Sequence, residues 1–195
     1  MKHTTRLLFA LLPMLGLLAP ARAAVETYAI DPVHSSVGFS IRHFVSKVPG
    51  SFTKSSGTIV VDRDNPEKNS VEATIDIGSV STANEKRDTH LKSPDFFDAA
   101  RFPTMTFKSK SWERTGEDSF DVTGDLTIKD VTKEVVLRVK SLGFGPGMQG
   151  TMLSGWEATT ILSKSAFNIT GPAMLGTALG DEVAVTISVE ASLKK

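Results

Sequence analysis

Three histidines beyond residue 23 are the side chains best suited to metal binding or acid–base chemistry: His34, His43 and His90. The aspartates nearest to them in the sequence are Asp31, Asp88, Asp95 and Asp98. Imidazole and carboxylate groups are common metal ligands, but no two of these histidines have the H-x-x-x-H spacing of a local ligand pair. Strand-like residues follow His43 directly. We therefore expect hydrogen-bonded histidines near strand ends, with no metal site and no cofactor.

Other residue patterns that support catalysis are missing from this sequence. It has no cysteine, which excludes thiol catalysis and thiolate metal sites. No serine lies in a G-x-S-x-G turn, and the glycine-rich stretch 143–147 lacks the lysine of a phosphate-binding loop. Asp95 and Asp98 lie three positions apart. This spacing fits two solvated carboxylates at a helix end as well as a pair of acid–base groups. We expect no catalytic residues and no enzymatic activity.

Residues 1–23 have the three-part layout of a secretory signal peptide. A short basic start precedes an apolar run over 7–19, and small residues precede the expected cleavage after Ala23. The apolar run is too short to span a hydrocarbon core of about 30 Å comfortably. We expect a cleaved leader, one domain over 24–195, a periplasmic location and no stable membrane insertion.

The charge balance excludes nucleic acid as a partner. The whole chain carries 22 Lys+Arg and 22 Asp+Glu. The leader holds Lys2, Arg6 and Arg22 and no acid, so the mature chain is slightly acidic, whereas nucleic-acid-binding domains normally present a basic face. A content of 40% hydrophobic and 23% charged residues is typical of a folded protein with a sizeable core.

Apolar and polar residues alternate along most of the remaining chain, which predicts β-strands with one covered face. In Val37–Ile41, for example, glycine and serine separate valine, phenylalanine and isoleucine. The other predicted strands lie at about 51–61, 71–77, 104–112, 120–129, 135–139, 152–162 and 183–189. A short opening strand over 28–30 can extend the first of them.

Eight strands joined by short turns predict an all-β fold. Short connections rich in turn residues make neighbouring strands antiparallel. Closure into a barrel removes the exposed edges of the sheet, so we expect an eight-stranded antiparallel β-barrel, with a two-sheet sandwich as the competing architecture. The interior of such a barrel either fills with side chains or holds one small ligand.

Residues 79–102 break the strand pattern and predict a short helical insertion. Thr82 and Glu85 have the spacing of a capping box at the start of a helix. Phe96 and Phe97 follow in the same connection, where solvent would otherwise surround them. We therefore expect these two rings to cover something apolar.

A series of separated motifs spans nearly all of the chain beyond the leader. They are Tyr28–Asp31 with His34-Ser35, Val37 and Phe39; Ser79–Thr82 with Arg87–Ser93; Asp95–Asp98; Phe102-Pro103 with Phe107–Ser109; Gly124–Ile128; and Val131–Lys133. In order and spacing they resemble the YceI-like polyisoprenoid-binding family. The resemblance breaks at 164–168, where many members carry an arginine and an aspartate.

The resemblance implies a lipocalin-like barrel, exported in many members, whose apolar cavity accepts a long isoprenoid or similar lipid chain. The family is not known for catalysis, and some relatives are implicated in binding quinone-like molecules or other amphiphiles. We therefore expect an exported protein that carries or sequesters an isoprenoid, a quinone or a similar lipid. The sequence specifies neither the delivery partner nor the oligomeric state, and a homodimer is compatible with it.

The side chains that we expect to bind the ligand combine the apolar rows of the strands with the aromatic residues of the insertion. They are Phe39, Ile41, Phe52, Ile75, Phe96, Phe97, Phe107, Leu126, Trp156 and Phe167, with His90 at the mouth. Arg87 and Asp88 either meet a polar head there or pin the insertion to the barrel.

Two other functions remain open. One is a non-catalytic envelope stress protein whose barrel is packed with side chains. The other is a barrel enzyme acting on a lipid or quinone, with His34, His43 or His90 as the acid–base group. The first predicts a filled interior, and the second requires a histidine that faces the ligand.

Overall fold

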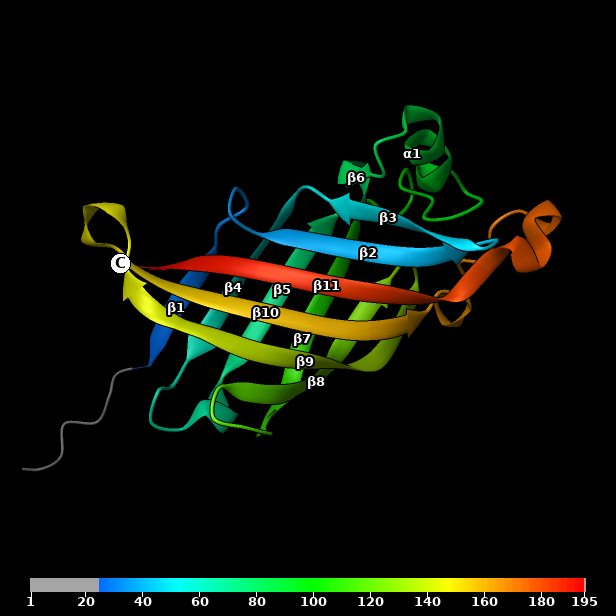
Figure 1. The fold of residues 1–195 in the computed structure, drawn as a ribbon. Coiled ribbons are helices and arrows are strands. Elements are labelled where there is room, and N and C mark those ends of the chain that lie inside the picture. Colours follow the sequence, from blue (N-terminus) through cyan, green and yellow to red (C-terminus); the bar gives the residue numbers. More distant parts are fainter. Residues whose placement is uncertain (1–24, 195) are drawn as a thin grey trace, which may run out of the picture.

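The computed structural model of this protein describes residues 25–194 (Figure 1). The predicted leader over 1–23 lies outside the described residues, so its cleavage stays a prediction. Within residues 25–194, one sheet of eleven strands curls around a single interior, and a short α-helix stands beside one end of it (Figure 1).

In chain order the strands are β1 (Glu26–Ile30), β2 (Ser36–His43), β3 (Ser46–Phe52), β4 (Ser55–Val61), β5 (Ser70–Asp76), β6 (Val80–Ser81), β7 (Thr104–Arg114), β8 (Ser119–Ile128), β9 (Val131–Pro146), β10 (Met152–Ser163) and β11 (Leu179–Leu193). The helix α1 spans Glu85–Lys92, and short 3-10 turns lie at Pro66–Lys68, Ile77–Ser79, Met148–Gly150, Ser165–Phe167 and Ala173–Ala178. Among the residues that the structure describes, no helix is both long and apolar enough to cross a membrane.

Eight strands close into a ring in the order β1, β4, β5, β7, β8, β9, β10, β11 and back to β1. Every pairing in this ring is antiparallel. The seam pairs Tyr28 with Leu193 and Ile30 with Ala191, so the first and last strands are neighbours. The all-β, eight-stranded antiparallel barrel with one short helix is therefore confirmed, and the sandwich is wrong.

Strands β2 and β3 extend the wall beyond β1 and β4 at one end of the barrel. β11 pairs with β1 through its last residues and with β2 through Leu179–Ser188. The sequence predicts one strand over 51–61, but the structure divides this segment at Thr53 and Lys54. Their backbone N–H groups donate to the carbonyl oxygen and the hydroxyl of Ser79, at 3.3 and 3.1 Å. The single strand is wrong because these two residues bond to the insertion instead of to a neighbouring strand.

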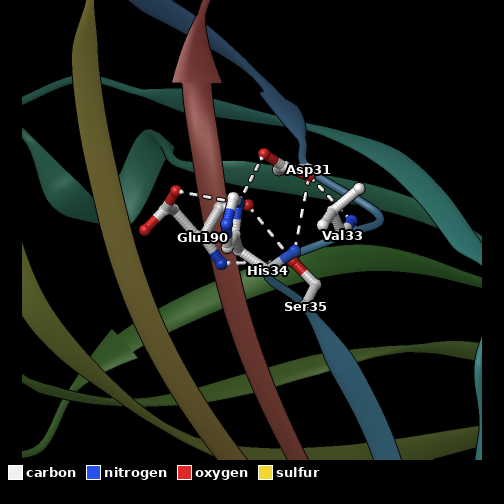
Figure 2. Close-up of polar contacts among 5 residues, drawn as sticks. All are labelled: Asp31, Val33, His34, Ser35 and Glu190. Atoms are coloured by element: carbon white, nitrogen blue, oxygen red, sulfur yellow. Dashed lines mark hydrogen bonds and ion pairs between the residues drawn. The ribbon is translucent and has the colours of Figure 1, made fainter. Parts of the chain in front are cut away.

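Polar contacts around His34 hold the break between β1 and β2 against β11 (Figure 2). The Asp31 carboxylate accepts a hydrogen bond from the Val33 N–H at 2.7 Å, and its second oxygen lies 2.9 Å from His34 Nδ1. The Ser35 hydroxyl donates to the Glu190 carbonyl oxygen, and the Glu190 N–H donates to the Ser35 hydroxyl, both at 3.2 Å. The turn is thus tied to the last strand of the ring.

Hydrogen bonds to Thr82 hold the helix α1 of the insertion in place. The predicted cap at Thr82 is wrong, because Asn84 caps α1 by accepting the Arg87 N–H at 3.0 Å. A left-handed residue, Ala83 with φ 59°, separates Thr82 from the helix start. Thr82 instead donates its N–H to Asp88 at 2.8 Å and accepts Arg87 Nη2 on its carbonyl oxygen at 2.8 Å. Arg87 and Asp88 therefore fix α1 to the residue that follows β6, and β6 in turn pairs with β3.

Candidate ligand-binding cavity

The barrel encloses a cavity of about 400 Å³. Every strand of the closed ring contributes to its wall, together with β2, β3, the insertion and the segment 164–179. Most of the side chains on the wall are valine, leucine, isoleucine or an aromatic residue. This volume falls within the range of about 300–1,000 Å³ typical of ligand pockets. The packed-barrel alternative therefore does not fit the interior that the structure describes.

Aromatic rings close one end of the cavity. Trp112 and Trp156 form its floor, with ring centroids 5.7 Å apart in an edge-to-face arrangement. Phe120 lies 5.6 Å from Trp112 on one side, and Phe144 lies 5.8 Å from Trp156 on the other. The ring of Tyr28 follows at 5.8 Å from Phe144. Edge-to-face contacts of this kind stabilise aromatic clusters beyond simple burial, so we call this the closed end.

A charged cluster seals the outside of the closed end. The Arg63 guanidinium lies 4.1 Å from the centroid of the Phe144 ring, a cation–π contact. It also donates to Glu26 at 2.7 Å and to the Tyr28 hydroxyl at 3.0 Å. Burial and the neighbouring Glu26 carboxylate raise the pKa of Tyr28 above its ordinary value, so this hydroxyl stays protonated and donates to Glu26 at 2.8 Å.

The two floor tryptophans differ in their hydrogen bonding. Trp156 Nε1 donates to the buried Ser154 hydroxyl at 3.1 Å. Trp112 Nε1 is buried and has no hydrogen-bond partner among the described residues. A buried N–H without a partner costs free energy, so Trp112 is held by packing alone.

Glycines make room for two aromatic rings of the wall. Phe39 on β2 pairs with Gly50 on β3, where an added Cβ would lie 2.3 Å from the ring. A Cβ at Gly124 on β8 would lie 2.5 Å from the ring of Phe107. Real β-carbons essentially never come this close to another atom, so the tip of each ring occupies the space that a larger residue would need.

The other end of the barrel is the open end, bounded by the insertion, the β2–β3 hairpin and the segment 164–178 (Figure 1). The rings of Phe39, Phe52 and Phe97 follow one another there at 5.6 and 5.7 Å. Phe96 packs against Gly171, where an added Cβ would lie 2.9 Å from its ring. Both rings line the cavity, but Phe96 is buried and also fastens the insertion, whereas Phe97 is only partly buried.

The titratable groups on the cavity wall are all basic. Among the described residues, those that line it are His43, Arg87, His90 and Lys164, with no carboxylate. His90 Nε2 lies 2.8 Å from Asp95, and the Lys164 ammonium donates to the carbonyl oxygens of Ile169 and Thr170 at 3.2 and 3.1 Å. These groups surround the open end, and the interior below them is apolar.

All eleven residues predicted to bind ligand lie on the wall of this cavity: Phe39, Ile41, Phe52, Ile75, His90, Phe96, Phe97, Phe107, Leu126, Trp156 and Phe167. Their contact with a ligand stays a prediction. The sequence reasoning missed others on the same wall, including Trp112, Val139, Val185, Ile187 and Lys164. The alternation in 135–139 and 183–189 was the signal that could have found the three aliphatic strand residues, while nothing in the local sequence indicated Lys164. The apolar residues Leu175 and Leu179 of the Gly/Pro-containing loop, which the sequence offers as cover for a cavity, also lie on this wall.

The histidines and aspartates weighed as a metal site fall into separate places. His34 joins Asp31 and Glu190, His90 joins Asp95, and His43 packs against a phenylalanine ring. The potential ligand atoms of Asp31, His34 and Glu190 lie within 4.8 Å of one another (Figure 2). The hydrogen bond between Asp31 and His34 lowers the pKa of Asp31 and raises that of His34, which suits an ion pair that fastens the turn.

A family model for the YceI-like domain matches residues 28–191, a range that includes the whole closed ring except its outermost residues. This chain belongs to the YceI-like family. The match confirms the family resemblance and accounts for the barrel, the insertion and the separated motifs together.

Relatives of the YceI-like family match over most of the chain. A UPF0312 protein of Ectopseudomonas mendocina is 40% identical over 162 residues, which cover 80% of this chain and 85% of the relative. Protein YceI of Salmonella arizonae is 38% identical over 185 residues, which cover 92% and 93% of the two chains.

Solved structures show the same fold. BcnA of Burkholderia cenocepacia has a TM-score of 0.76 at 25% identity, covering 83% of this chain and 98% of BcnA. The YceI protein of Campylobacter jejuni has a TM-score of 0.69 at 33% identity, covering 77% and 88%. A polyisoprenoid binding domain from Saccharophagus degradans, implicated in plant cell wall breakdown, has a TM-score of 0.67 at 15% identity, covering 86% and 98%, a likeness in fold alone.

Proposed function

We propose that this protein is an exported carrier that holds a long isoprenoid, a quinone or a similar lipid chain inside its barrel. The observation that carries the proposal is the apolar cavity of about 400 Å³, whose titratable groups lie at the open end. The polyisoprenoid binding of the Saccharophagus degradans domain, which shares the fold, supports the same class of ligand. The proposed role is binding, without a catalytic step.

The hydrophobic effect supplies the driving force for such binding. Burial of one CH₂ group contributes about 0.8 kcal/mol, so a chain of about twenty carbons gives on the order of 16 kcal/mol before costs. Loss of translational and rotational freedom opposes this by about 4–15 kcal/mol, and ordering the flexible chain adds to the cost. Because the favourable contribution has no direction, the cavity is expected to tolerate several chain types.

We further propose that the protein acts in the periplasm. The basic start, the apolar run and the small residues before Ala23 support export. N-terminal sequencing of the protein recovered from a periplasmic extract tests this, and a mature chain that still begins at Met1 would contradict it.

Identification of the lipid that co-purifies with the protein tests the function. The protein is purified gently from its native envelope and extracted with organic solvent, and the extract is examined by mass spectrometry. We expect a stoichiometric lipid with a long apolar chain. Recovery of buffer components only, from protein that also fails to bind an added prenyl quinone, would contradict the proposed carrier function.

A variant that fills the cavity makes the test specific. Val185 on β11 lines the cavity and pairs with Phe39 on the adjacent strand β2. The next residue, Thr186, is exposed on the outer face. Val185→Trp is expected to displace the lipid, because the indole takes its space. Thr186→Trp adds the same group outside and serves as the matched control, which should retain the lipid. Equal retention by both variants would mean that the lipid binds elsewhere.

A further inference from the structure

Apolar side chains project from the tips of two segments at the open end. Phe44 is 62% exposed, Met174 is 90% exposed, and Val45 is fully exposed. Phe44 and Val45 form the turn between β2 and β3, and Met174 lies on the segment that follows β10. The Phe44 N–H donates to the Ala178 carbonyl oxygen at 2.7 Å, so the two segments lie together. We call Phe44, Val45 and Met174 the rim patch.

The hairpin turn does not itself require these residues. His43 pairs with Ser46, which leaves Phe44 and Val45 as a two-residue turn, and such turns favour asparagine and glycine. Phe44 has φ 50°, a left-handed conformation that is unfavourable for a bulky residue. Strained, exposed apolar residues of this kind point to a functional contact outside the chain.

The rim patch is continuous with the mouth of the cavity. Leu175, next to Met174, borders both the cavity and the shallow hollow beneath the rim patch. His43, next to Phe44, also lines the cavity. A flat apolar surface that covered the rim patch would therefore lie directly against the opening.

Charge around the rim patch favours an anionic surface. The β2–β3 hairpin beside it carries Arg42 and Lys47 and no acid, whereas Lys164 at the mouth lies 3.9 Å from Asp181. The insertion over 79–102 balances four acids with four bases. The closed-end segments 62–68 and 113–118 together hold six acids and three bases, so the hairpin makes the open end the more basic of the two. Basic residues beside exposed apolar groups are typical of proteins that bind anionic lipid surfaces.

We propose that the rim patch docks onto an anionic lipid bilayer, with the mouth of the cavity facing the membrane. Three exposed side chains fall short of the area of about 800 Å² per partner that a stable protein interface buries, but apolar tips need to enter a bilayer by only about 5–10 Å. This docking extends the proposed function, because it gives a lipid a route between membrane and cavity that avoids water. Vesicle binding and lipid retention are measured separately, so either proposal can fail alone.

Co-sedimentation with vesicles of phosphatidylethanolamine and phosphatidylglycerol in equal amounts tests the docking. Val45→Ser/Met174→Gln removes one valine and one methionine of the rim patch. The matched control, Val33→Ser/Met148→Gln, removes the same residue types from loops away from the mouth, where Val33 is 81% and Met148 89% exposed. Phe44→Asn is a third variant that suits the left-handed turn, so folding is expected to be preserved.

We expect the wild type to sediment with these vesicles, and the rim-patch double variant and Phe44→Asn to bind about tenfold more weakly or worse. The control should stay within about twofold of the wild type, because its two substitutions lie away from the rim patch. Equal binding by the two double variants, or no binding by the wild type, would overturn the docking. A dimer that becomes a monomer in the rim-patch variant, with vesicle binding unchanged, would assign the patch to a second copy and overturn it as well.

Discussion

Aromatic side chains occur at both ends of the barrel, but their surroundings differ. At the closed end, the rings from Phe120 to Tyr28 touch in an unbroken series, and Arg63 covers them from outside. At the open end, the rings of Phe39 and Phe97 are only partly buried and border empty space. The same residue type therefore closes the barrel in one place and leaves room in the other.

The connecting segments show the same contrast. The loop after β4 is held by the Asp62 carboxylate, which accepts the N–H groups of Asp64 and Asn65 at 3.1 and 2.9 Å, while Asn69 accepts the Asp62 N–H at 2.8 Å. The hairpin tip at the open end presents Phe44 and Val45 to solvent instead. The closed-end loop is thus held by hydrogen bonds within the chain, while the hairpin tip at the open end projects apolar side chains into solvent.

The largest expected effect comes from opening the closed end. Trp156→Ala removes a floor ring and leaves the buried Ser154 hydroxyl without its partner. We expect a loss of about 3–5 kcal/mol in the free energy of unfolding, measured by urea denaturation. Phe97→Ala at the open end should cost clearly less, and equal losses would abolish the contrast between the ends.

Substitutions of the adjacent residues Phe96 and Phe97 are expected to affect lipid retention and stability differently. Phe97→Asp is expected to weaken lipid retention by about tenfold or more, because a carboxylate then borders the apolar cavity. Its effect on unfolding should stay near 1 kcal/mol, since Phe97 is only partly buried. Phe96→Asp buries the charge against Gly171 and should mainly destabilise the fold. Retention is measured by mass spectrometry and stability by urea; losses of stability that match in the two variants would make Phe97 a core residue.

Replacing each floor tryptophan by phenylalanine is expected to change the free energy of unfolding by less. Trp156→Phe breaks a hydrogen bond to a buried hydroxyl, whereas Trp112→Phe removes an N–H that has no partner among the described residues. We expect Trp156→Phe to cost about 1 kcal/mol more than Trp112→Phe. Paired urea titrations measure the difference, and the reverse order would show that the Trp112 N–H has a favourable interaction.

The smallest expected effect concerns pH and the turn at His34. The pKa of His34 is raised above its ordinary value of 6.5 by the hydrogen bond to Asp31, so its contribution is full below 6.5 and lost as pH rises through the raised value. The pKa of Asp31 is lowered below 3.8 by His34, so its contribution is lost only as pH falls through the lowered value. The stability difference between wild type and His34→Gln should therefore be larger at about pH 5 than at about pH 8. A difference that grows toward pH 8 would contradict this assignment.

The strands and the apolar wall were predictable because alternation is a local property. In β8, for example, Phe120, Val122 and Gly124 are buried and the residues between them are less so, as the period of two requires. The division at Thr53 was not predictable, because it depends on hydrogen bonds to Ser79, which is distant in the sequence. The cap at Asn84 was missed because a left-handed Ala83 gives no sequence signal.

The site was predictable in its apolar rows and less so at its ends. Phe96 and Phe97 are alike in sequence, but Phe96 packs against His90 and Gly171 while Phe97 packs against Phe52. Leu175 has no periodic pattern around it, so its place between the cavity and the rim patch depends on tertiary structure. Long-range packing of this kind is invisible to a local pattern.

The pairing of β1 with β11 determines when the barrel can close. Because Tyr28 pairs with Leu193 and Ile30 with Ala191, the ring cannot close until residues 191–193 are available to pair with β1. A chain that ends before Ala191 would expose two unpaired strand edges, which invite aggregation. The apolar interior is therefore fully enclosed only once the first and the last strand of the ring are both in place.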